Sequence, residues 1–282
     1  MQGQRAWARL KYQRAAMGSI RLYLRFIGMS FRSQLQYPAS FLMMTMGNLT
    51  VTSIEFLAIW ALFTRFGSLQ DWTLPQVAVF YGMVHTAFAM AEAGARGFDI
   101  LHRWVRAGDF DRILLRPRST VLQVLGLEFQ LMRVGRFAQG LVVLGWGIRN
   151  LGIALTPMQL LLIIGSICGG SLLFSGLFIL QATLSFWSVE SLEVVNVATY
   201  GGVEAAQVPM SIYNEWFRRF FTVVIPLAAI NLVPLSAILE HPSLQGVPGW
   251  LAWLSPLAGL AFCLVCLKIW HFGVRHYRST GS

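Results

Sequence analysis

Residues 158–186 read MQLLLIIGSICGGSLLFSGLFILQATLSF and contain no charged side chain. A helix of this length crosses a hydrocarbon core of about 30 Å, because each residue adds about 1.5 Å. Five other apolar blocks lie along the chain. We therefore predict an all-α polytopic membrane protein with six transmembrane helices, at 41–63, 77–95, 130–150, 158–186, 220–239 and 250–268.

Composition supports this fold class and excludes others. Of 282 residues, 56% are hydrophobic and 12% are charged, against roughly 25% charged residues in soluble domains. The net charge of +10 does not indicate a nucleic-acid partner, because the basic residues fall between apolar blocks instead of gathering on one soluble face. Membrane lipids are the partner that this arrangement predicts.

The positions of the basic residues predict an orientation. If both termini are cytoplasmic, 20 of the 22 lysines and arginines lie on inner segments. Only Arg65 and Arg149 then lie outside. This bias follows the positive-inside rule.

The N-terminal segment, 1–38, is predicted to form a basic amphipathic interfacial helix ahead of the transmembrane domain at 39–278. It contains seven basic residues and no acidic one, and Leu22, Phe26 and Met29 recur at helical spacing. Such a helix lies on an anionic leaflet with its apolar face in the lipid. Pro38 is expected to end it.

Two spans have features of their own. For the third we expect one long helix that begins near Thr120, with Arg133, Arg136 and Arg149 snorkelling to the headgroups. In the fourth, Gly165 and Gly169 have the G-x-x-x-G spacing that allows close helix contact.

Three ionisable residues, Glu55, His85 and Glu92, lie inside predicted spans. A charge at bilayer depth costs at least about 2.5–3.5 kcal/mol, so each should face protein or water. One interpretation is a proton or cation path. The other is a set of groups that fix helix packing, with Glu92 close to the inner headgroups. Both remain open on sequence grounds.

The segment 187–218 is predicted to be acidic and interfacial or partly inserted. Its Glu190, Glu193 and Glu204 stand out on an otherwise basic inner face. They form either an acidic vestibule that favours cationic substrates or a set of partners for nearby arginines.

The loop at 99–118 contains the stretch RAGDFDRILLRPRS. Asp109 is expected to cap a short helix, and Pro117 to end it. Phe110, Ile113 and Leu114 would share one apolar face, with Arg112 and Arg116 on another. Such a helix suits docking into a groove of another protein, or resting on lipid headgroups.

No catalytic motif is present. The sequence lacks a G-x-x-x-x-G-K-[ST] phosphate loop, an H-E-x-x-H pair and a G-x-S-x-G elbow. Cys168, Cys263 and Cys266 all lie in apolar blocks, where a structural role is expected and no metal site. The chain is therefore predicted not to be an enzyme.

Three stretches carry a resemblance to a known family: GDFDRILLRP at 108–117, FWSVESLEVVN at 186–196 and VPMSIYNEWFRRFFTVVIPLAAINLVP at 208–234. With the basic first helix and six spans, they resemble permease subunits of type 2 ATP-binding cassette (ABC) exporters. The similarity covers about 17–278 and is greatest to a bacterial subgroup of viologen-exporter-like permeases.

The resemblance implies partners and a location. Two permease subunits, identical or paralogous, would form the pathway, and two copies of a separate ATP-binding subunit would hold ATP and magnesium, with no cofactor in this chain. The protein would be a multi-pass protein of the bacterial plasma (inner) membrane. The residues that would couple to the ATPase are Gly108, Asp109, Phe110, Asp111, Arg112, Ile113, Leu114 and Arg116.

Two alternatives and one departure accompany this interpretation. A proton-coupled secondary transporter would use Glu55, His85 and Glu92, and a membrane scaffold would transport nothing. The predicted outer turn before the sixth span has only about ten residues, which argues against the re-entrant helices that some relatives have there. The sequence does not name the substrate.

Overall fold

The computed structural model describes residues 21–187, 191–239 and 248–279. This part of the chain contains helices and no strand, apart from one isolated bridge between Leu69 and Trp72. After a helix at 21–35, the elements are α2 (Pro38–Phe66), α3 (Leu74–Asp99), α4 (Leu101–Arg106), α5 (Phe110–Leu114), α6 (Thr120–Leu125), η1 (Leu131–Arg133), α7 (Val134–Asn150), α8 (Pro157–Leu184), α9 (Ser191–Ala206), η2 (Met210–Ile212), α10 (Glu215–Arg219), η3 (Phe220–Val224), η4 (Ala228–Ile230), α11 (Leu232–Leu235), α12 (Gly249–Leu254) and α13 (Leu257–His276).

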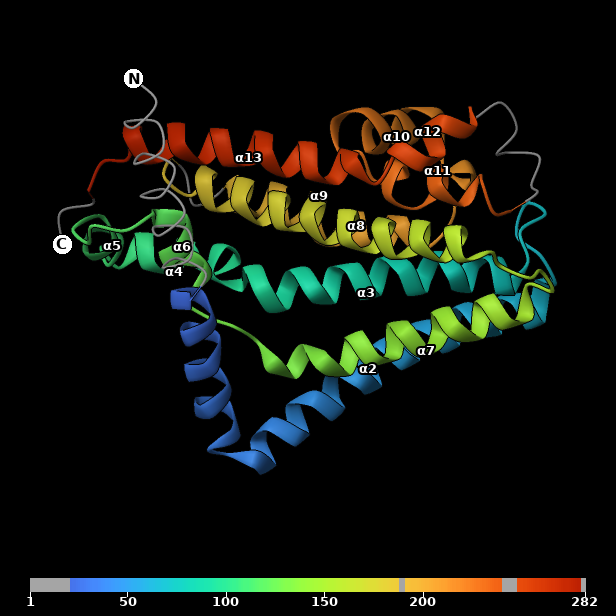
Figure 1. The fold of residues 1–282 in the computed structure, drawn as a ribbon, viewed down its shortest axis with the longest axis horizontal. Helices are drawn as coiled ribbons and strands as arrows, with labels where there is room; N and C mark the ends of the chain where they lie inside the picture. The colour runs from blue at the N-terminus through green and yellow to red at the C-terminus, as the bar shows by residue number, and fades with distance from the viewer. Residues whose placement is uncertain (1–20, 188–190, 240–247, 280–282) are drawn as a thin grey trace, which may run out of the picture.

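The long helices run side by side, so the molecule has two ends (Figure 1). At the left of the figure lie α4, α5, α6 and the C-terminal end of α13, and we name this the α5 end. At the right lie α11, α12 and the turns that join α2 to α3 and α7 to α8, and we name this the α11 end. The elements that could carry function are thus separated along the bundle.

Sequence signals explain where the helices begin at the α11 end. The hydroxyl of Thr156 accepts a hydrogen bond from the Gln159 amide at 3.2 Å, and the Gln159 side chain accepts one from the Thr156 amide at 2.9 Å. Pro157 follows at the first helical position. Thr73, Pro75 and Gln76 repeat this arrangement at the start of α3. Both are capping boxes, which satisfy the free amides of a first turn.

Four helices of the described residues are long and apolar enough to cross a membrane: Pro38–Phe66, Leu74–Arg106, Pro157–Leu184 and Leu257–His276. Two further helices run alongside them. Helix α7 has 17 residues and α9 has 16, which gives each a length of about 25 Å. Helix α7 packs along α3, and α9 packs against α8 (Figure 1).

Small residues allow α8 and α13 to approach closely. A Cβ atom at Gly259 would overlap the carbonyl oxygen of Gly169 and stand 2.5 Å from its carbonyl carbon. Gly165 faces Pro256 more loosely, at 4.0 Å. The close contact predicted from the G-x-x-x-G spacing is therefore confirmed, with α13 as the partner helix.

The N-terminal region turns sharply between two helices. Residues 21–35 form one helix, and Pro38 stands in the first turn of α2. The first helix lies across the bundle direction (Figure 1). Pro38 begins the next helix as well as limiting the first, since it tolerates the first helical turn and no later position. The position of this helix at the membrane interface stays a prediction.

The third span differs from the predicted long helix. The chain leaves helix α6 at Gly126 and resumes at η1, so the segment from Thr120 onward is broken. Gly126 packs against the ring of Phe26, whose Cε2 would lie 2.8 Å from an added Cβ atom. Arg133 and Arg136 are also not at the surface, since each side chain is only 15% exposed. They pair with Glu92, whereas Arg149 is exposed as expected.

The predicted span at 220–239 is not one helix. Its residues are divided between the π-helix η3, the 3₁₀ helix η4 and the four-residue α11. Pro226 and Pro234 explain much of this division, because proline lacks the amide hydrogen that a continuing helix needs. The helix that runs beside α8 in this part of the chain is α9, within the segment predicted to be interfacial.

Residues 208–239 gather toward the α11 end. The Trp72 indole donates a hydrogen bond to the Ser211 hydroxyl at 3.1 Å, and the Gln159 side chain donates one to the Ala237 carbonyl at 3.2 Å. Ile230 reaches deeper, since its Cδ1 would lie 3.2 Å from a Cβ atom at Gly170, about 20 Å along α8. This segment thus enters the bundle and returns. The outer turn before the sixth span, where no re-entrant helices were expected, lies mostly outside the described residues.

The last predicted span, 250–268, is longer and has a break. Helix α12 ends at Leu254, and α13 begins at Leu257 and continues to His276. The break falls at Ser255 and Pro256, and an added Cβ atom at Gly169 of α8 would overlap the Pro256 carbonyl oxygen. The break therefore lies next to the close contact between α8 and α13.

Candidate functional site

Helix α5 lies at an extreme end of the bundle, in the loop predicted to couple (Figure 1). The chain reaches it through Gly108, whose φ of +74° lies in the left-handed region that favours glycine. Asp109 precedes the helix as predicted, but its carboxylate makes no cap hydrogen bond. It pairs instead with the Arg112 guanidinium at 3.3 Å. The predicted aspartate cap is therefore wrong, because Arg112 three residues later takes the carboxylate.

The inward face of α5 is held by aromatic rings. Phe110 is fully buried, and its ring centroid lies 5.0 Å from those of Phe186 and Tyr277 and 6.1 Å from that of Trp270. Phe186 follows α8, and Trp270 belongs to α13. Phe110 and the buried Ile113 thus fix α5 to the ends of two long helices.

Polar contacts complete this attachment. The Gln123 side chain donates hydrogen bonds to the Ile113 and Arg118 carbonyls, both at 3.1 Å. The Ser279 hydroxyl donates to the Asp111 carboxylate at 2.6 Å. Tyr277 lies beyond α13, where burial and the Asp111 carboxylate raise the pKa of its phenol. The short helix is therefore anchored on both sides.

The outward face of α5 differs from the predicted apolar face. Leu114 is 40% exposed, and Leu115 is 84% exposed. Arg112 and Arg116 are exposed beside them. Of the three residues expected to project together, Phe110 and Ile113 point inward, so Leu114 and Leu115 are the apolar residues that a partner could reach.

A buried ion-pair cluster lies between α3 and the start of α7. Glu92 is 1% exposed, and its two carboxylate oxygens lie 3.2 Å from Arg133 and 3.0 Å from Arg136. Arg136 also lies over the Phe88 ring at 5.4 Å. Arg133 donates further hydrogen bonds to the Gln130 and Asn48 side chains. This cluster joins α2, α3 and α7.

A second cluster surrounds Asp99 at the end of α3. Its carboxylate pairs with Arg96 and accepts hydrogen bonds from Gln181 of α8 at 3.1 Å and Tyr200 of α9 at 3.3 Å. Asp99, Gln181 and Tyr200 were not predicted as site residues from the sequence. The pairing of Glu92 with Arg133 and Arg136 could have been predicted, because opposite charges lie at similar depth in neighbouring spans. The partners of Asp99 could not, because they depend on which helices are neighbours in the fold.

Glu55 and His85 lie farther along the bundle and make few polar contacts. Tyr81 donates a hydrogen bond to the Thr52 carbonyl at 2.7 Å and stacks on His85 with ring centroids 3.9 Å apart. Neither ring nitrogen of the buried His85 has a hydrogen-bond partner among the described residues. Within that part of the chain, no hydrogen bond links Glu55, His85 and Glu92.

Of the three glutamates in the predicted acidic segment, the structure describes the side chain of Glu204 alone. Glu204 is exposed on α9 and accepts a hydrogen bond from Gln207 at 2.7 Å. Glu193 belongs to α9, but its side chain is outside the described part of the structure, as is the whole of Glu190.

The fold and the α5 loop can now be compared with known proteins. The model of the family described as "ABC-2 family transporter protein" matches residues 49–281. No curated protein and no solved structure matches the chain. The family match covers most of the chain, from within α2 to beyond α13, and leaves out the first helix and the first eleven residues of α2. The chain therefore belongs to the ABC-2 transporter family, whose members are membrane-spanning transport permeases.

Proposed function

We propose that this chain is the transmembrane permease subunit of an ATP-driven exporter. A second permease subunit, identical or paralogous, would complete the pathway. Two copies of a separate ATP-binding subunit would supply the energy, with ATP and magnesium bound there. The observation that carries the proposal is the geometry of α5, which is exposed on one face and fixed to the transmembrane helices on the other.

The two faces of α5 would do different work. Leu115, with Arg112 and Arg116, would dock into the ATP-binding subunit, because an apolar anchor with flanking cations suits a groove with an acidic rim. Phe110 would transmit the movement, since its ring contacts those of Phe186 and Trp270 at the ends of α8 and α13. Movement of the ATPase would then shift these two helices together.

The proposed topology has six crossings: α2, α3, α7, α8, α9 and the α12–α13 pair. The α5 end would be cytoplasmic with both termini, in a bacterial plasma membrane. Placing α9 as the fifth crossing moves Arg218 and Arg219 to the α11 end, where Arg65 and Arg149 also lie. The coupling-loop arginines stay at the α5 end, so the positive-inside bias is kept.

The alternative functions are less well supported. A proton-coupled transporter would need a connected relay, but Glu92 is held by two arginines and His85 is not hydrogen-bonded to either glutamate. A scaffold without transport would not explain a short helix fixed to the ends of α8 and α13 while it presents Leu115 to solvent.

We place the chain in the viologen-exporter-like subgroup, with organic cations as substrates. Glu190, Glu193 and Glu204 would form an acidic vestibule, and the exposure of Glu204 on α9 supports this. Replacing the three glutamates by glutamine should lower efflux of an organic dication several-fold and spare efflux of a neutral substrate. Unchanged dication efflux in inverted vesicles would remove the vestibule from the proposal.

The docking role of α5 predicts the effect of one surface substitution. Leu115→Glu should reduce co-purification of the ATP-binding subunit at least about tenfold, because it places a charge at the centre of the apolar contact. Thermal stability of the permease alone should stay the same, since Leu115 is 84% exposed. The measurement is the ratio of the two subunits after affinity purification from membranes.

Phe66→Glu is the matched control. Phe66 is 71% exposed and ends α2 at the α11 end, far from α5. It should leave the subunit ratio unchanged. If Leu115→Glu and Phe66→Glu retain the ATP-binding subunit equally, α5 is not the docking element.

A further inference from the structure

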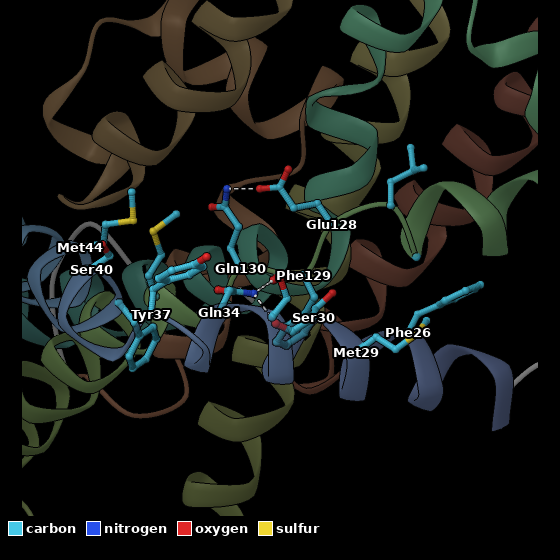
Figure 2. Close-up of a pocket in the computed structure, with 15 residues that line it drawn as sticks. Phe26, Met29, Ser30, Gln34, Tyr37, Ser40, Met44, Glu128, Phe129 and Gln130 are labelled. Carbon is cyan, nitrogen blue, oxygen red and sulfur yellow. Dashed lines mark hydrogen bonds between the residues drawn. The ribbon is translucent and has the colours of Figure 1, made fainter.

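A cavity of about 600 Å³ lies between the first helix, the start of α2 and the segment that joins α6 to η1. Figure 2 shows Gln34 near its centre, with Tyr37 on one side and Phe129 on the other. Its volume falls in the range of small-molecule sites. It lies at the periphery of the bundle, away from α5 and from Glu204 on α9. The lining residues are Phe26, Met29, Ser30, Ser33, Gln34, Tyr37, Ser40, Phe41, Met44, Gly126, Leu127, Glu128, Phe129, Gln130 and Met132.

The lining combines apolar surface with one carboxylate. Aromatic rings and methionines supply most of it, and serines and glutamines supply hydrogen-bonding groups. Glu128 is the only acidic or basic residue among the lining positions. In a chain with a net charge of +10, the cavity thus carries a local negative charge beside a basic helix.

The carboxylate is oriented by a short series of contacts. The Gln130 side chain donates a hydrogen bond to the Glu128 carboxylate at 2.6 Å (Figure 2), and Arg133 donates one to the side-chain oxygen of Gln130 at 2.9 Å. Arg133 is in turn paired with Glu92. No ion pair to Glu128 occurs among the described residues, and the arginine of this series, Arg133, pairs with Glu92. A cationic ligand can therefore pair with the Glu128 carboxylate.

The walls are held in place before any ligand binds. The Gln34 side chain donates to the Phe129 carbonyl at 2.5 Å and accepts from the Leu131 amide at 2.9 Å. Phe31 stacks on Phe129 with ring centroids 5.7 Å apart. Preorganised walls reduce the entropy lost on binding. The cavity is thus a built site and not only a gap between two helices.

We infer that this cavity binds an amphiphile with an ammonium head, the cation at Glu128 and the apolar chain along Met29, Met44 and Met132. Charge complementarity selects the head, because a cation gains both from the carboxylate and from aromatic faces such as Phe129. Met44 of α2 and Met29 of the first helix are both exposed, so an apolar chain can leave the cavity along either helix. An ethanolamine lipid and a free alkylammonium share this chemistry.

The test uses the purified full-length protein in detergent. Native mass spectrometry should show a bound phosphatidylethanolamine retained about tenfold better than phosphatidylglycerol, if the source is lipid. Calorimetry with hexyltrimethylammonium should show saturable binding, if the site accepts the free cation. In either arm, Glu128→Gln should weaken binding about tenfold, which corresponds to about 1.4 kcal/mol.

Two further variants keep the test decisive. Glu215→Gln removes a largely exposed carboxylate paired with Arg219 at the other end and should leave binding unchanged. Ser33→Trp adds a large side chain at the cavity wall and should block binding while Glu128 is kept. The inference is overturned if Glu128→Gln binds as the parent does, if the two lipids are retained equally and hexyltrimethylammonium does not bind, or if Ser33→Trp has no effect.

Discussion

Replacing Glu92 by glutamine is expected to destabilise the folded protein by about 3–5 kcal/mol, because it leaves two buried guanidinium groups without their carboxylate. Glu92 is 1% exposed, and Arg133 and Arg136 are each 15% exposed, so solvent cannot replace the lost interaction. The expected result is a large fall in the midpoint of thermal unfolding and in the yield of monodisperse protein. Fluorescence-detected size exclusion of heated samples measures both.

Two comparisons separate this ion-pair cluster from a general sensitivity to mutation. Glu215→Gln breaks an exposed pair with Arg219 and should change stability by well under about 1 kcal/mol. Combining Glu92→Gln with Arg136→Gln should be less damaging than the sum of the two single changes, because each removes the other's unpaired partner. Strict additivity, or an unchanged midpoint for Glu92→Gln alone, would contradict the buried cluster.

The glutamate itself was visible in the sequence, but its role was not. A carboxylate inside an apolar block fits a proton path or a packing group equally well. The choice depends on what faces it, and Arg133 lies 41 positions further along the chain. Our prediction that Arg133 and Arg136 snorkel to the headgroups assumed that each arginine acts alone. In the fold, the carboxylate of Glu92 pairs with both guanidinium groups near the α5 end of α3 and α7, so none of the three charges is buried alone.

The fold was predictable where hydropathy and helix length agree. The blocks at 41–63, 77–95 and 158–186 correspond to α2, α3 and α8, because uninterrupted apolar stretches of this length have few alternatives to a helix. Hydropathy was misleading at 220–239, where apolar residues with two prolines fold into short pieces near the α11 end. It was equally misleading at 191–206, where α9 contains Glu193 and Glu204.

The α5 region shows the same limit on a smaller scale. Periodicity placed Phe110, Ile113 and Leu114 together on one face. Periodicity does not determine whether that face points into the bundle or toward solvent. The answer comes from Phe186 and Trp270, two rings from distant segments that enclose Phe110. A short helix is oriented by its neighbours, so its exposed residues could be assigned only from the three-dimensional arrangement.

Gly259→Leu is the second substitution with a large expected effect, about 3 kcal/mol or more of destabilisation. An added Cβ atom would overlap the backbone of Gly169 on α8. A change of rotamer cannot relieve this overlap, because all three nearest atoms belong to the backbone of Gly169. Helices α8 and α13 would have to separate, with loss of packing along their whole contact. The expected result is a strongly lowered unfolding midpoint.

Gly145→Leu and Gly259→Ala make the interpretation specific. Gly145 of α7 has no atom within 4 Å of an added Cβ, so its replacement should leave the midpoint close to that of the parent. Gly259→Ala adds only the Cβ atom, yet it meets the same backbone and should still lower the midpoint clearly. In a complex with the ATPase, it should also weaken stimulation of ATP hydrolysis by substrate, because α13 carries the Trp270 against which Phe110 packs. If Gly259→Ala leaves both the midpoint and this stimulation unchanged, then α8 and α13 do not meet at Gly169 and cannot move as the single unit that coupling through α5 requires.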